Sequence, residues 1–95
     1  MPATLTEKIL ARAAGRDRVT PGEIVTVGVD LAMAHDSSGP RRWKARLEAL
    51  GTGLWDPEKV VIVSDHYVPA VDADSAAILK LTREFARDYG VKNFY

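Results

Sequence analysis

The sequence contains no cysteine, so this chain alone has no thiolate for a disulfide, a zinc site or an iron–sulfur cluster. It also lacks an excess of either charge, because 13 basic residues balance 13 acidic ones. No long-range positive field is therefore available to attract nucleic acid or anionic lipid. The N-terminal stretch has no apolar core of signal-peptide length, and the composition is not apolar enough for a membrane span. These absences argue against nucleic-acid and membrane partners and favour a cytoplasmic location.

The composition that remains is that of a small folded domain. The chain has 95 residues, of which 46% are hydrophobic and 27% charged, which is ordinary for a soluble globular protein. A chain of this size buries only about 60 to 65% of its unfolded surface, so its margin of stability is small. We expect one domain covering residues 1–95.

Local signals predict three helices that alternate with three strands. The first helix lies between Thr4, which with Glu7 has capping-box spacing, and Gly15. The second begins at Pro40 and ends at Gly51, and the third follows the capping residue Asp72. β-branched or apolar runs predict strands at residues 24–30, 60–63 and 91–95. This order favours an α/β fold, a small three-layer αβα piece with a mainly parallel sheet.

A parallel sheet would bring distant residues to one edge. If the strands at 24–30 and 60–63 are neighbours joined by the helix that begins at Pro40, a right-handed crossover places their carboxyl ends together. Ligands of open α/β sheets bind at this edge.

Both histidines of the chain adjoin an aspartate, as His35–Asp36 and as Asp65–His66. Each pair follows a predicted strand, so we expect a shared cleft in which imidazoles and carboxylates transfer protons. Neighbouring side chains of an extended segment point to opposite faces, so each pair needs a local turn or a partner elsewhere. An alternative stays open, since exposed loops after strands are often rich in Asp and His without any function. A metal site built from these four residues is a weaker alternative and no metal ligands are assigned, because without His-x-x-x-His spacing the sequence signal for zinc is weak.

Three segments together resemble a known family. "TEKILA" at 6–11, "AHD" at 34–36 and "DHYVPA" at 65–70, in this order and spacing, resemble the opening of the large subunit of 3-isopropylmalate dehydratase and homoaconitase, members of the aconitase superfamily. The resemblance extends from Thr4 to Tyr95. It implies that residues 1–95 form a truncated version of the aconitase-like N-terminal domain.

The resemblance also implies a chemistry. Family members are hydro-lyases that remove and re-add water across a hydroxy di- or tricarboxylic acid, in leucine or lysine biosynthesis, with a [4Fe-4S] cluster. It carries a catalytic role onto His66, the acid that helps the hydroxyl leave, and onto Asp65, which orients it. His35 matches a residue of the family's active-site cleft that is a glutamine in aconitase, and Asp36 follows it in the same segment of that cleft.

The family's cluster cysteines, most of its substrate-binding arginines and its serine base lie beyond the segment matched here. The chain alone is therefore expected neither to bind the cluster nor to catalyse the family reaction. The resemblance implies that it is an N-terminal segment or a split subunit. Its partners would be the remainder of the large subunit or a cysteine-bearing chain, a small subunit and a small hydroxy acid, and an exposed apolar surface could also support a homo-oligomer.

Two other functions remain open from the sequence. The chain could be a free-standing, cluster-independent enzyme that uses the same two aspartates and two histidines. It could instead be a non-enzymatic module that binds another subunit through its helices, with Trp43 and Phe85 as the important side chains.

Overall fold

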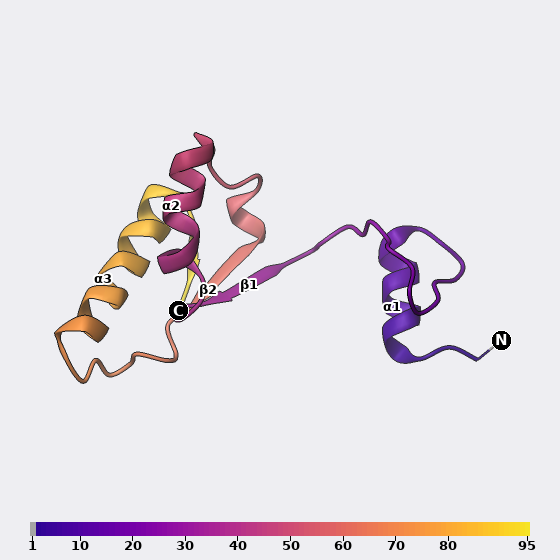
Figure 1. Ribbon diagram of the computed structural model, residues 1–95, viewed down its shortest axis with the longest axis horizontal. Coiled ribbons are helices and arrows are strands. Elements are labelled where there is room, and N and C mark those ends of the chain that lie inside the picture. Colours follow the sequence, from indigo (N-terminus) through magenta and orange to yellow (C-terminus); the bar gives the residue numbers. More distant parts are fainter. Residues whose placement is uncertain (1) are drawn as a thin grey trace. The chain divides into compact units, whose positions relative to one another are not determined.

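A computed structural model describes residues 2–95 of the chain (Figure 1). They fall into two compact units, Met1–Asp30 and Leu31–Tyr95. Among the described residues, the first unit contains one α-helix, and the second contains two α-helices, a short 3-10 helix and a three-stranded sheet. Among the residues described, none forms a helix that is both long and apolar enough to cross a membrane.

Helix α1, Leu5–Ala14, begins and ends where the sequence predicts. Thr4 Oγ1 accepts the Glu7 N–H at 3.1 Å, and the Glu7 carboxylate accepts the Thr4 N–H at 3.3 Å, so the capping box is complete. Gly15 ends the helix in the left-handed region at φ 66°, which glycine adopts without a steric penalty. Two of its apolar side chains, Leu5 and Ile9, are exposed.

The predicted strand at residues 24–30 is wrong. This segment contains no strand, and Ile24 is fully exposed. One of its backbone groups is used elsewhere, since the Gly28 N–H donates to the Ala13 carbonyl at the end of α1 at 3.0 Å. A β-branched run forms a strand only where another strand pairs with it. The strand expected to pair with it, Val60–Val63, pairs instead with Ala32–His35.

The sheet of the second unit is parallel throughout, with strand order β1-β2-β3. Its strands are Ala32–His35 (β1), Val60–Val63 (β2) and Asn93–Phe94 (β3). Helix α2, Pro40–Leu50, connects β1 to β2, followed by a short 3-10 helix at Pro57–Lys59, and α3, Ala73–Asp88, connects β2 to β3. The predicted α/β class with a parallel sheet is confirmed.

Helices α2 and α3 lie side by side and cover one face of this sheet (Figure 1). Val60 and Ile62 of β2 are buried there against Phe85 and Ala86 of α3. Trp43 of α2 extends the cluster, with its ring centroid 6.2 Å from that of Phe85. Alternate strand residues point to the opposite face, where Met33 is exposed. In the predicted three-layer αβα arrangement, a second layer of helices covers that face. This second layer stays a prediction.

Candidate active site

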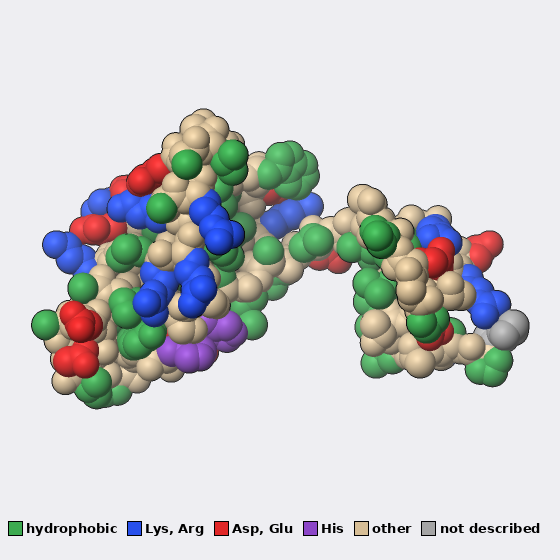
Figure 2. Space-filling model, in the orientation of Figure 1, with side chains coloured by type: hydrophobic (Ala, Val, Ile, Leu, Met, Phe, Trp, Pro, Cys, Tyr) green, Lys and Arg blue, Asp and Glu red, His purple; other side chains and the backbone are tan. Residues whose placement is uncertain are grey.

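The two Asp–His pairs meet at the carboxyl edge of the sheet. Strand β1 ends at His35, and the Asp36 N–H extends the ladder by donating to the Val63 carbonyl at 3.1 Å. Strand β2 ends at Val63, so Asp65 and His66 follow at the same edge. Figure 2 shows the two histidines as a single patch.

Asp65 lies between both imidazoles. Its Oδ2 is 2.8 Å from His35 Nδ1, and its Oδ1 is 2.7 Å from His66 Nδ1. The two rings meet edge to face, with centroids 5.2 Å apart. His35 therefore pairs with the carboxylate of the other strand and not with its sequence neighbour.

Asp36 has different surroundings from the other three residues. Its carboxylate is fully buried and accepts the backbone N–H of His66 at 3.2 Å and that of Tyr67 at 3.2 Å. Its Oδ1 is also 3.5 Å from His66 Nδ1. The sequence predicts a proton-transfer group here, whereas the carboxylate in the structure binds the backbone that carries His66.

The electrostatics of the cluster favour a protonated imidazole beside an ionised carboxylate. The hydrogen bond with Asp65, and then the negative charges of Asp65 and Asp36, raise the pKa of His66. The hydrogen bond with His66, followed by the bond with His35 and the charges of both rings, lowers the pKa of Asp65. Because the His66 side chain is 51% exposed, its ring is open to a ligand.

A cation also lies close to this edge of the sheet. Arg41, the second residue of α2, donates from Nη1 to the Tyr67 hydroxyl at 3.0 Å. This bond joins the start of α2 to the segment that follows His66. The sequence signal for it is weak, because arginines near a helix end are usually solvated.

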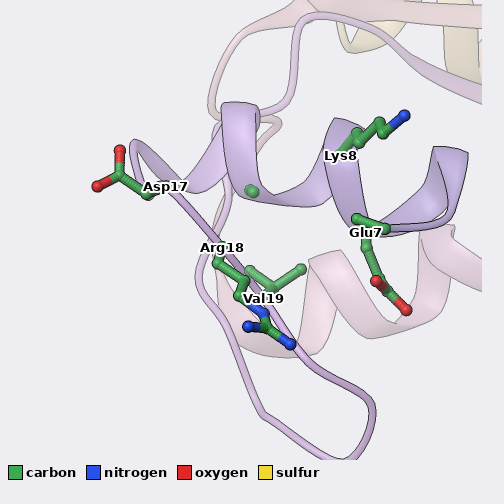
Figure 3. Close-up of a pocket in the computed structure, with 7 residues that line it drawn as sticks. Glu7, Lys8, Asp17, Arg18 and Val19 are labelled. Carbon is green, nitrogen blue, oxygen red and sulfur yellow. The ribbon is translucent and has the colours of Figure 1, made fainter. Parts of the chain in front are cut away.

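Two cavities among the described residues lie away from these four residues. One cavity of about 170 Å³ lies within the first unit and is lined in part by Glu7, Lys8 and Val19 (Figure 3). An apolar hollow of about 310 Å³ lies in the second unit, lined by Ala32, Trp43, Arg46, Leu47, Leu54 and Val60. At the candidate site itself, the side chains of His35, Asp65 and His66 are 39%, 39% and 51% exposed, so solvent reaches this edge of the sheet.

The iron–sulfur cluster that the resemblance implies does not fit this donor set. Such clusters are bound through cysteine thiolates, and the chain contains no cysteine. The site offers imidazole nitrogens and carboxylate oxygens instead. The chemistry of this site therefore depends on its imidazoles and carboxylates.

No family model matches the chain. Individual relatives do: over its whole length the chain is 46% identical to a probable 3-isopropylmalate dehydratase large subunit of Methanothermobacter thermautotrophicus, of which it covers 23%. With 96% of its length it is 46% identical to a probable methanogen homoaconitase large subunit of the same organism, covering 22%. It is 48% identical, over its whole length, to the 3-isopropylmalate dehydratase large subunit of a Sulfurihydrogenibium species, again covering 22%. The chain thus spans less than a quarter of the length of these relatives.

Proposed function

Since the chain matches the N-terminal segment of the 3-isopropylmalate dehydratase and homoaconitase large subunits, we propose that it supplies an Asp–His acid pair to an aconitase-type hydro-lyase. In this proposal Asp65 and His66 act in the dehydration and rehydration of a small hydroxy di- or tricarboxylic acid. The observation that supports it most directly is the 2.7 Å contact between Asp65 Oδ1 and His66 Nδ1 at the open edge of the sheet.

The proposed step is a proton transfer. A hydroxyl leaves as water only if it gains a proton, and an imidazolium of raised pKa can donate one. Asp65 holds Nδ1 of His66, so Nε2 is the nitrogen that remains to face the substrate. In the reverse direction the same nitrogen accepts the proton from the attacking water. General acid help of this kind contributes about 10²- to 10⁴-fold in rate.

The other two residues act through this pair. His35 binds the second oxygen of Asp65 and so fixes the plane of that carboxylate. Asp36 binds the backbone N–H groups of His66 and Tyr67 and so fixes the segment that carries the acid. We assign positioning roles to both.

The remaining catalytic parts would come from the remainder of a large subunit or from a cysteine-bearing partner chain. The relatives are named large subunits and are more than four times longer than their match to this chain. We propose as partners a chain equivalent to the rest of such a large subunit, together with a small subunit. Any iron–sulfur cluster would be bound by those partners.

Reconstitution tests this function. The 95-residue chain is mixed with a small subunit and with a relative's large subunit that lacks the matching N-terminal segment. Dehydration of 3-isopropylmalate is then followed by the absorbance of the unsaturated product. We expect His66→Ala to lower kcat about 10²- to 10⁴-fold with a smaller effect on KM, and the exposed Lys80→Ala control to behave like the unchanged chain.

The same mixtures distinguish the alternative of a non-enzymatic interaction module. The apolar hollow beside Trp43 and Leu54 favours this alternative, because such surfaces commonly bind another protein. A complex that forms and is equally active with His66→Ala would establish the interaction role and refute the acid role. Failure of the chain to bind the remainder of the large subunit would contradict both.

A further inference from the structure

Three side chains at the sheet edge have the composition of an open transition-metal site. One ligand atom each from His35, Asp65 and His66 lies within 4.8 Å of the others. Two imidazoles and one carboxylate, with a water at the fourth position, are a donor set of open zinc sites. We propose that this chain binds one divalent transition-metal ion, Zn²⁺ being the best suited, through these three residues.

The ligand atoms lie within 4.8 Å of one another, so the side chains must rotate to close around an ion. Asp65 already lies between the rings, with its oxygens 2.7 and 2.8 Å from the two Nδ1 atoms. Zinc bonds of about 2.1 Å in tetrahedral geometry separate the ligand atoms by about 3.4 Å. The two contacts with Asp65 must therefore widen by about 0.6 to 0.7 Å, which partly exposed side chains can do by rotating. The ion replaces the protons that now join these atoms.

Charge selects a divalent ion. Asp65 and the buried Asp36 each contribute one negative charge, and Asp36 Oδ1 lies 3.5 Å from His66 Nδ1. An ion of charge +2 neutralises both. Asp36 also binds the backbone of His66 and Tyr67, so it orients one ligand from behind, as outer carboxylates do in metal sites.

The donor types select among divalent ions. Imidazole nitrogen suits zinc, copper, nickel and iron, whereas Mg²⁺ and Ca²⁺ prefer oxygen donors alone. The sequence signal for such a site is weak because close ligand spacing is missing, and His35 and Asp65 are 30 positions apart. The parallel register, which pairs His35 with Val63, brings them together.

This inference stands independently of the proposed function. Binding concerns the chain by itself and needs neither a partner nor an activity. An ion that ligates both rings would also occupy the group that the hydro-lyase proposal uses as an acid. Metal binding and acid catalysis would therefore be alternative states of the same residues.

The site can be tested by isothermal titration calorimetry, in which ZnCl₂ is added to the untagged 95-residue chain at pH 7. We expect one ion per chain. Asp65→Asn and His35→Ala should each weaken binding by at least about tenfold. The exposed Asp30→Asn control should bind like the unchanged chain, and Mg²⁺ should not compete.

A measurement without substitutions covers the case in which a variant fails to fold. The ring signals of both histidines in NMR spectra of the unchanged chain should shift or broaden as Zn²⁺ is added up to one equivalent. Absence of binding, or binding that leaves both ring signals unchanged, would overturn the proposal. Equal affinity in a folded Asp65→Asn variant would do the same.

Discussion

Asp36 shows how one side chain can support a site without facing it. Burying a carboxylate is costly unless hydrogen bonds replace the lost water. Here the N–H groups of His66 and Tyr67 supply them, and the fully buried carboxylate is thereby held under the segment that follows β2. Asp65 faces solvent by comparison, and its oxygens bind the two imidazoles.

Asp36→Asn tests this role at the residue scale. The amide loses the negative charge that strengthens these hydrogen bonds, and an NH₂ group in place of Oδ1 can no longer accept the His66 N–H. We expect the free energy of unfolding to fall by about 1 to 3 kcal/mol, measured by urea denaturation. The amide protons of His66 and Tyr67 should exchange faster. The exposed Asp30→Asn serves as the control, and a similar loss in both variants would contradict the role.

At the scale of elements, the junction between β1 and α2 is the most constrained part of the site. Gly39 is buried at the N-cap of α2, and its N–H donates to the His35 carbonyl at 2.8 Å. A Cβ atom there would lie 2.6 Å from the His35 carbonyl oxygen and 2.9 Å from Ala34 Cβ. The chain can therefore turn from the strand into the helix this tightly only because residue 39 has no side chain.

Gly39→Ala should lower the free energy of unfolding, because the added Cβ would crowd the His35 carbonyl oxygen and Ala34 Cβ. The nearest atom is backbone and cannot move without displacing the end of β1, so we expect a loss of about 1 to 3 kcal/mol. Thermal or urea unfolding measures it, and His35 ring signals in NMR spectra should change. Gly53→Ala is the matched control, because a Cβ at Gly53 meets nothing within 4 Å. If the two variants are equally stable, the junction is not as tight as the structure indicates.

At the scale of the whole molecule, the second unit depends on a small core. Phe85 is almost fully buried, and its ring stacks on Tyr89 at 4.3 Å and meets Trp43 edge to face. It contacts the sheet through the cluster that includes Val60 and Ile62. Since the sheet edge carries the candidate site, the stability of this core determines whether the site exists.

Phe85→Ala should remove most of the stability of Leu31–Tyr95. Loss of a buried phenylalanine costs about 3 to 5 kcal/mol, which is a large part of the 5 to 15 kcal/mol typical of a folded domain. Near-UV circular dichroism and urea titration measure the effect. Trp55→Ala is the control, since Trp55 is 91% exposed, and it should cost less than about 1 kcal/mol. A folded Phe85→Ala variant with unchanged stability would show that the core lies elsewhere.

The helices could be predicted from the sequence because their signals are local. Thr4 with Glu7, Pro40, and Asp72 each act within one turn of the helix that they begin, and all of them are found in these positions. The strand predicted at residues 24–30 is wrong, because a strand is not decided by local signals of this kind. A strand is defined by its partner, and β2 pairs with Ala32–His35 instead.

For the candidate site, too, the residue types follow from the sequence and their contacts follow from the tertiary structure. The sequence by itself determined which residues have the chemistry, because the chain has only two histidines and each adjoins an aspartate. The tertiary structure alone decided that Asp65 binds both imidazoles and that Asp36 is buried under His66. The physical reason is that a parallel register fixes contacts between residues 30 positions apart, which no local pattern of residues records.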